Sequence, residues 1–191
     1  MKLTSSLIVA VAMIVPLFFL PAHAQSAKSE SELQLGVDAY KNSHYDDAVH
    51  HFEKAVDLDD SNLTARLYLA NTCTNQYIPG VDSPENVHWA EEAIQQYQRI
   101  IDSDGERASK INSAKGIAYL HLNMKKFDDS RRYYEIASDL DRNDPEPYYF
   151  LGVIDWTKCY QARMEARARL ALRPEQQLNA SDKDQKRPAT I

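Results

Sequence analysis

Small and apolar residues recur along this chain at helical spacing, and the recurrence has a fixed period. Four small residues lie inside apolar helical stretches, namely Gly36, Ala70, Ala118 and Gly152. The interval between the first two equals the interval between the last two, whereas a longer stretch separates Ala70 from Ala118. Self-similarity at a fixed period is the signature of repeat proteins. The pattern therefore predicts a repeated helical unit with an enlarged middle copy.

A second series marks the following helix of each copy. A small residue, an aromatic residue and a small or apolar residue stand at positions i, i+4 and i+7, which form one face of a helix. The three sets are Ala48, Phe52 and Ala55; Ala93, Tyr97 and Ile100; and Ser130, Tyr134 and Ala137. A small residue on the first helix lets the second helix approach, and the aromatic ring fills the remaining space. We therefore expect antiparallel helix pairs that pack through these residues.

These positions resemble the tetratricopeptide repeat (TPR) family, whose helix–turn–helix unit has the same period as the intervals above. The matching residues are Leu35-Gly36, Tyr45, Ala48, Phe52 and Ala55 in the first copy; Ile117-Ala118, Phe127, Ser130, Tyr134 and Ala137 in the third; and Leu151-Gly152 at the start of a fourth. The resemblance covers about residues 29–158. It implies an all-α fold, a TPR-type α-solenoid of about three to three-and-a-half repeats with a C-terminal capping helix.

The copies are predicted at residues 29–62, 63–107, 111–144 and, in part, 145–160. The middle copy inserts 76–88 between its helices, where Ser83-Pro84 predicts a helix start with Ser83 as the N-cap. No turn residue follows from Asp155 to Leu172. The last helix therefore either continues or bends into a basic capping helix at 161–173, where Met164, Ala168 and Ala171 keep the helical spacing. Residues 174–191 have little to bury and are expected to be disordered.

The N-terminal segment, 1–24, has the features of a secretory signal peptide. Lys2 precedes an apolar run from Leu7 to Leu20, and Ala22-His23-Ala24 forms a small-residue cleavage site. The run is shorter than the roughly 20 residues that span a bilayer, so a membrane anchor is the weaker interpretation. We expect cleavage after Ala24 and a periplasmic or secreted protein, exported by a bacterium, with no integral membrane segment after cleavage.

Charge is distributed unevenly in the remaining chain. Residues 25–161 carry 14 Lys and Arg against 24 Asp and Glu, a net charge of −10, whereas residues 162–173 carry four Arg against one Glu. An acidic body argues against a nucleic-acid partner, because phosphate binding needs a basic face.

Candidate catalytic chemistry is sparse. His44, His50 and His51 are close in sequence, but their spacing matches no metal site. Cys73 is expected on a packed helix face and more than two repeats from Cys159, too far for a disulfide. The paired aspartates at 46–47, 59–60 and 128–129 recur at turns, where Asp caps helices. Without a glycine-rich loop, nucleophile motif or zinc motif, we expect neither an enzyme nor a bound metal or cofactor.

The resemblance implies that the first helix of each pair lines a concave surface that binds a protein or peptide. The residues carried over to that surface are Leu33, Val37, Tyr40, Lys41, Leu67, Asn71, Thr74, Asn75, Lys115, Tyr119, Leu122, Asn123, Tyr149, Val153 and Trp156. Any one of these side chains could instead only pack between helices. Some TPR domains grip the acidic C-terminus of a chaperone with Lys, Asn and Arg, but Leu33 and Val37 occupy the corresponding first-copy positions, so that activity is not expected.

Two functions follow as hypotheses. The first is an exported, non-enzymatic TPR adaptor or scaffold that binds its partner through this surface or through residues 76–88. The alternative is a self-assembling structural protein in which the basic C-terminal helix docks on the acidic body, which would make the protein a homo-oligomer.

Overall fold

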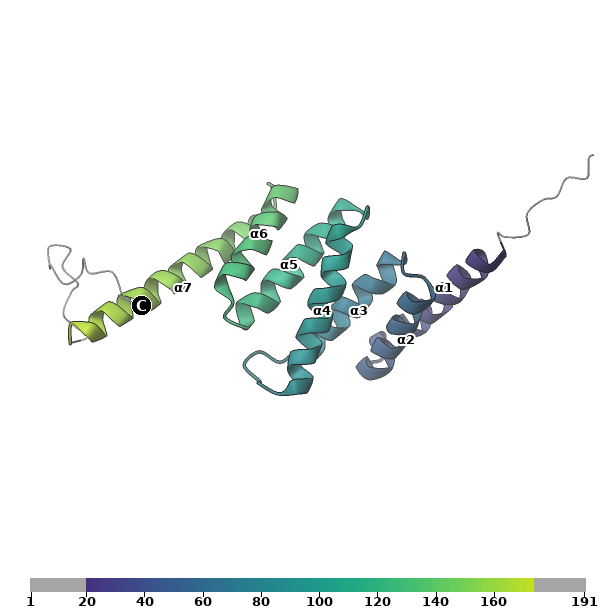
Figure 1. The fold of residues 1–191 in the computed structure, drawn as a ribbon, viewed down its shortest axis with the longest axis horizontal. Coiled ribbons are helices and arrows are strands. Elements are labelled where there is room, and N and C mark those ends of the chain that lie inside the picture. The colour runs from purple at the N-terminus through teal and green to yellow at the C-terminus, as the bar shows by residue number, and fades with distance from the viewer. Residues whose placement is uncertain (1–19, 174–191) are drawn as a thin grey trace, which may run out of the picture. The chain divides into compact units, whose positions relative to one another are not determined.

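The computed structural model describes residues 20–173, and the predicted signal peptide and C-terminal tail lie largely outside this range. Within it the chain forms seven helices and no strand (Figure 1). The helices are α1 (Leu20–Lys41), α2 (Tyr45–Leu58), α3 (Leu63–Gln76), α4 (Pro84–Asp102), α5 (Arg107–Asn123), α6 (Phe127–Leu140) and α7 (Pro145–Arg169). The predicted all-α class is confirmed.

The chain divides into two compact units, one up to Asn62 and the other from Leu63 onward. The described part of the first unit is the hairpin of α1 and α2. Gly36 packs closely there, because a Cβ atom in its place would lie 2.5 Å from Cε1 of Phe52. The Ser29 hydroxyl donates to the carbonyl of Ala55 at 2.7 Å, and Asn62 Nδ2 donates to Ser29 Oγ at 3.0 Å. These contacts hold α1 against α2.

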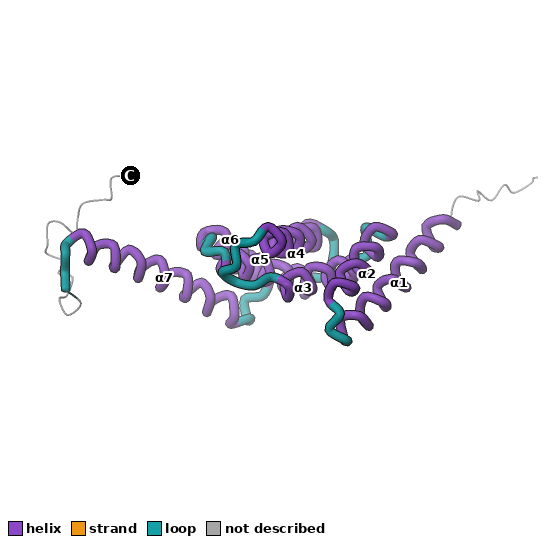
Figure 2. The backbone as a smooth tube through the Cα atoms, turned by 90° about the horizontal axis from the view of Figure 1, so that it is seen from below, coloured by secondary structure: helices purple, strands orange, loops and turns teal. Residues whose placement is uncertain are grey.

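The second unit contains two further hairpins, α3–α4 and α5–α6, followed by α7. Figure 2 shows these helices without an intervening strand. The expected small and aromatic residues form the packed faces: Ala70, Ala93, Tyr97, Ala118, Ser130, Tyr134 and Ala137 are all buried. Ser130 Oγ donates to the carbonyl of Ala118 at 2.8 Å, which holds α6 against α5. Tyr134 stacks on Phe150 with ring centroids 5.0 Å apart, and this pair joins α6 to α7.

Of the two possibilities left open for the last helix, the structure has the continuous one. α7 is one continuous helix of 25 residues, so the segment from 161 onward prolongs it instead of folding back. Gly152 was expected at a close helix contact, yet a Cβ atom there would meet nothing within 4 Å. The reason is that residues 20–173 contain no second helix for the fourth pair. Without a turn residue after Asp155, nothing interrupts the hydrogen bonding of the helix.

The turns of the first and third copies have the same backbone conformation. Ser43 and Lys125 both have positive φ angles, of 62° and 60°, just before the second helix of their pairs. The aspartates that follow were expected as caps. Instead Asp46, Asp47, Asp128 and Asp129 lie in the first turns of α2 and α6, where the helix dipole favours negative charge.

Residues 20–173 include no helix that combines the length and the hydropathy needed to cross a membrane. In the same range, Cys73 is buried and Cys159 is exposed, and neither forms a disulfide. His51 Nδ1 lies 2.7 Å from Glu32 Oε2, so this histidine joins α2 to α1.

Candidate partner-binding surface

The exposed side chains of α5 and α7 form the candidate surface of the second unit. Tyr119 on α5 is 41% exposed, and Tyr149 and Trp156 on α7 are 68% and 66% exposed. Tyr119 lies on the first helix of the third copy, and Tyr149 and Trp156 lie on the helix that begins the fourth copy. Tyrosine and tryptophan bury much area on binding at low entropic cost, which makes them frequent anchors at protein interfaces.

Lys115 connects α5 to the start of α7. Its Nζ lies 3.0 Å from Asp144 Oδ2, and it also forms an ion pair with Glu146. Burial alone would lower the pKa of Lys115, but the hydrogen bonds to Glu146 and Asp144 outweigh it and raise the pKa. Lys115, one of the two lysines predicted to bind a partner, therefore already has two carboxylates as partners.

Asp144 has a second role at this junction. It is the N-cap of α7 and accepts a hydrogen bond from the backbone N–H of Glu146 at 3.0 Å. This bond, followed by the hydrogen bond from Lys115, holds the pKa of Asp144 below its ordinary value. The carboxylate thus fixes both the start of α7 and its attachment to α5.

Asparagines of the predicted surface also have internal partners. Asn71 Oδ1 accepts a hydrogen bond from the Tyr97 hydroxyl at 2.7 Å, and Thr74 Oγ1 lies 3.2 Å from the same hydroxyl. Asn123 Nδ2 donates to the carbonyl of Tyr119, one turn earlier in α5, at 2.9 Å. Asn75 is exposed. Asn71 therefore joins α3 to α4, and Asn123 bonds within α5. Asn71 is also exposed, and a partner-binding role for both residues stays a prediction.

In the first unit the predicted residues differ in exposure. Lys41 is exposed, whereas Val37 and Tyr40 are half-buried. The Tyr40 ring packs edge-on against Tyr45, with centroids 5.5 Å apart. Leu33 was carried over as a surface residue, but it is only 4% exposed and belongs to the core, because its position on α1 faces α2.

The segment between α3 and α4 forms an ordered loop held by Asn86, which the sequence did not single out. Asn86 is buried at the start of α4 and accepts a hydrogen bond from Ile78 N–H at 2.7 Å. Its Nδ2 donates to the carbonyls of Ile78 at 2.9 Å and of Val81 at 2.7 Å. Ser83 is the N-cap of α4 and accepts from Asn86 N–H, as predicted. The loop therefore presents the exposed side chains of Ile78 and Val81 on a fixed backbone.

Gly116 is a second residue that the repeat pattern did not indicate. A Cβ atom at this position would lie 2.6 Å from Cε2 and Cζ of Tyr97. In the third copy the close approach thus falls at Gly116 as well as at the aligned Ala118. The available signal in the sequence was its position two residues before Ala118, the aligned small residue of the third copy.

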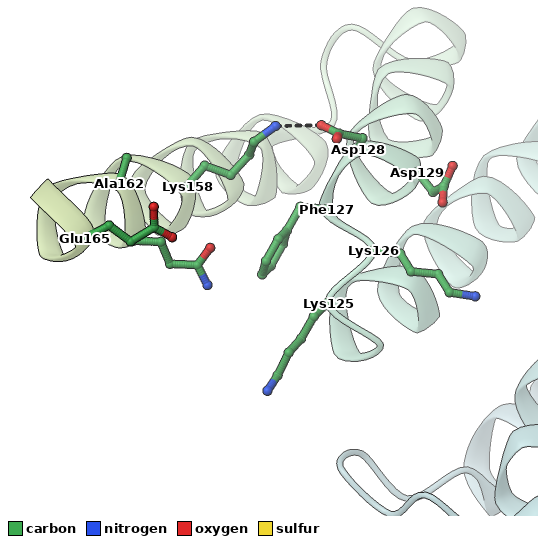
Figure 3. Close-up of a pocket in the computed structure, with 9 residues that line it drawn as sticks. Lys125, Lys126, Phe127, Asp128, Asp129, Lys158, Ala162 and Glu165 are labelled. Carbon is green, nitrogen blue, oxygen red and sulfur yellow. Dashed lines mark hydrogen bonds and ion pairs between the residues drawn. The ribbon is translucent and has the colours of Figure 1, made fainter. Parts of the chain in front are cut away.

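A cavity of about 400 Å³ lies between the turn before α6 and the second half of α7 (Figure 3). Lys158 Nζ and Asp128 Oδ1 are 2.6 Å apart across its edge, and this bond lowers the pKa of Asp128. The lining residues include three lysines and three carboxylates, which are Lys125, Lys126, Lys158, Asp128, Asp129 and Glu165. Balanced charge gives the cavity no preference for an anionic or a cationic ligand.

Comparison with known proteins agrees with this architecture. Residues 33–76 match the sequence model of the Tetratricopeptide repeat family. The chain has a TPR fold. Over about 70% of the chain this rests on solved structures that share the fold at low sequence identity. No curated protein matches the sequence.

Three of these similar structures show the extent of the agreement. The first TPR domain of Spaghetti (RPAP3), bound to an HSP90 peptide, has 16% identity and a TM-score of 0.57, over 70% of this chain and 95% of that chain. The N-terminal domain of stress-induced protein-1 from C. elegans has 19% identity and a TM-score of 0.56, over 69% and 98%. The second TPR domain of human RPAP3, in complex with an HSP70 peptide, has 15% identity and a TM-score of 0.53, over 70% and 98%.

Proposed function

We propose that the protein is an exported, non-enzymatic TPR adaptor that binds an extended segment of a protein partner. The observation that carries the proposal is the exposure of Tyr119 on α5, a first helix, beside the ordered junction of Lys115 with Asp144. TPR-fold domains act as protein-interaction modules, and two of the similar structures are bound to peptides. Export rests on the predicted signal peptide, and a role in envelope assembly, secretion or trafficking follows from that location.

The peptide chemistry is expected to differ from that of those two domains. Their peptides, SRMEEVD and SGPTIEEVD, end in acidic motifs. Here Leu33 is buried, and Lys115 is already paired with two carboxylates. Because the charge of Lys115 is already paired and Tyr119 is exposed, this surface favours a ligand with apolar or aromatic side chains over an acidic terminus.

Binding can be tested by recovering partners from envelope extracts with the purified protein and measuring the affinity of the recovered partner. Tyr119→Ala should weaken binding about tenfold or more, as loss of an aromatic anchor does. Glu91→Ala is the control, because Glu91 is exposed on α4, a second helix, and lies outside residues 76–88. Equal affinity of the Tyr119→Ala variant and the unmodified protein would refute binding through this surface.

Export has its own test. The N-terminus of the protein recovered from the periplasm or the medium should be Gln25, as the cleavage site predicts. Recovery in the cytoplasm with Met1 retained would refute export while leaving partner binding open to its separate test.

Self-assembly is the second candidate function, and it is motivated by the concentration of basic residues at the end of α7. Arg163, Arg167 and Arg169 all lie on the part of α7 beyond residue 161. Light scattering should show an oligomer for the full chain and a monomer after removal of residues 162–191. A full chain that is already monomeric would eliminate this candidate.

A further inference from the structure

One face of α7 presents aromatic side chains to solvent along several turns. Tyr149, Trp156 and Tyr160 lie close to one line on the helix and are 68%, 66% and 49% exposed. Gly152 lies on the same face with open space beyond it. The Trp156 and Tyr160 rings stack with centroids 5.3 Å apart, so they form one surface. We call this surface, made of Tyr149, Gly152, Trp156 and Tyr160, the α7 stripe.

In earlier copies the corresponding face receives a helix. Gly36 is the counterpart of Gly152 and lies against the ring of Phe52 from α2. Ala118 is the counterpart in α5 and accepts its hydrogen bond from Ser130 of α6. Among the described helices, α7 packs chiefly on α6, through Phe150 and Ile154 on its opposite side. The α7 stripe is therefore a helix-binding face for which residues 20–173 supply no helix.

We propose that the α7 stripe binds the same stripe of a second copy of this chain, with the two α7 helices antiparallel and Trp156 at the two-fold axis. The proposal rests on the self-assembly candidate, not on the adaptor role. It gives self-assembly a definite surface and a register that can be tested.

Size complementarity supports this register. With Trp156 on the two-fold axis, a residue that follows Trp156 in one copy faces the residue that precedes Trp156 by the same number of positions in the other copy. This is because a two-fold axis pairs positions symmetrically. Tyr160 then faces Gly152 of the second copy, so the larger side chain meets the open position. Tyr149 faces Arg163, and a guanidinium over an aromatic ring is a favourable pair.

Charge complementarity selects the antiparallel orientation. α7 begins with acidic residues, Asp144 and Glu146, and ends with Arg167 and Arg169. Antiparallel pairing brings the basic end of each copy to the acidic start of the other, while parallel pairing would bring like charges together. Glu146 keeps 46% of its side chain exposed although it pairs with Lys115, so it can meet a second cation.

Residues 174–191 are a poor source for a helix that would cover the α7 stripe. Residues 174–191 contain two prolines and, as large apolar residues, only Leu178 and Ile191. A helix that covers an aromatic face needs apolar residues at each turn on one side. A second α7 has that pattern.

Cysteine cross-linking of the full chain tests the register. Cys159→Ser removes the exposed thiol, and Cys73 should not cross-link because it is buried. In that background Trp156→Cys should give a disulfide-linked dimer under mild oxidation, because the two positions meet at the axis. Gly152→Cys mixed with Tyr160→Cys should cross-link as a mixed pair. Tyr149→Cys should not cross-link with itself, since antiparallel helices separate these two positions by about 21 Å along the axis.

Light scattering on the unmodified chain and on Trp156→Asp distinguishes an error in the antiparallel register from an error in the self-assembly proposal itself. Because Trp156 is largely exposed, this variant should keep its helical circular dichroism and become a monomer. A dimer that forms without the Trp156→Cys cross-link, or that cross-links through Tyr149→Cys, would overturn the antiparallel stripe while self-assembly stands. A monomeric unmodified chain would overturn both, and it would leave the α7 stripe to a different protein.

Discussion

The ring of Tyr97 lies against the backbone of Gly116, so closely that a Cβ atom at residue 116 would lie 2.6 Å from two ring carbons. Tyr97 is only 3% exposed, and its hydroxyl donates to Asn71 at 2.7 Å. The ring is thus fixed at both ends and joins α4 to both α3 and α5.

Gly116→Ala should therefore destabilise the protein, because the added methyl group displaces a ring that cannot rotate away. We expect the free energy of unfolding to fall by about 1–3 kcal/mol, as in other overpacked cores. Urea unfolding followed by circular dichroism measures it. The control is Gly152→Ala, studied below the concentration of any self-association, where Ala should stabilise the helix by up to about 1 kcal/mol. Equal stability of Gly116→Ala and the unmodified protein would contradict the close contact.

Asn86→Ala should loosen the loop between α3 and α4. The change leaves Ile78 N–H and the carbonyls of Ile78 and Val81 without the side chain that pairs them. Loss of a buried hydrogen-bonding group costs about 1–3 kcal/mol. Hydrogen exchange at Ile78 N–H should accelerate more than exchange within α5. Asn123→Ala, which removes a single exposed hydrogen bond, should change stability far less, and a loop that stays protected in Asn86→Ala would refute this role.

Lys115→Met should weaken the attachment of α7 to α5, by about 1 kcal/mol for a partly exposed pair at neutral pH. The effect depends on pH with a definite sign. Lowering the pKa of Asp144 in the folded state stabilises the protein above its ordinary pKa of 3.8, and this contribution is lost as the pH falls. Raising the pKa of Lys115 stabilises the protein below its ordinary value of 10.5, and this contribution is lost as the pH rises through the folded value.

The difference in unfolding free energy between Lys115→Met and the unmodified protein should therefore be fully present at neutral pH and shrink in acid below the pKa of Asp144. Urea unfolding at several pH values measures it. A pH-independent difference would show that packing of the lysine stem, not its charge, makes the contribution.

His121 should destabilise the fold in mild acid. Its ring stacks on Tyr133 with centroids 5.8 Å apart, and Nδ1 has no hydrogen-bond partner in the described part of the chain. Burial lowers the pKa of His121, while Asp129 raises it and Lys126 lowers it to smaller extents. Because the unfolded state binds the proton more tightly, stability should fall as the pH drops below the ordinary value of 6.5.

His121→Phe keeps the stacking and removes the proton-binding site, so it should lose less stability than the unmodified protein between about pH 7.5 and about pH 5. The urea midpoint at each pH measures the loss, and the exposed His88→Gln serves as the control. An equal acid sensitivity of His121→Phe and the unmodified protein would assign the effect to other groups.

The repeat itself could be derived from the sequence because its signal is local. A helix brings residues i, i+4 and i+7 to one face, so the series Ala48, Phe52 and Ala55 predicts both a helix and the side that it buries. The N-cap at Ser83 is equally local, since Asn86, whose N–H donates to it, follows within the first turn of the helix. The fold class, the helix pairs and the start of α4 were predictable for this reason.

The chemistry of the surface was not predictable in the same way. Lys115 and Asn71 are polar residues on first helices, and the sequence could not show that their partners are Asp144 and Tyr97, each on a later element of the chain. These bonds depend on the distance between neighbouring helices, which no local pattern encodes. For the same reason the sequence did not reveal the hydrogen bonds by which Asn86 holds the loop at Ile78 and Val81.

By itself the sequence determined that the chain folds into paired helices and which faces they bury, because helical periodicity and side-chain size act within a few turns. Only the tertiary structure decided which polar groups are already paired and which helix-binding face residues 20–173 leave uncovered. Gly152 shows the difference: its sequence position is that of a contact residue, but contact needs a second helix, and α7 continues past the point where that helix would begin.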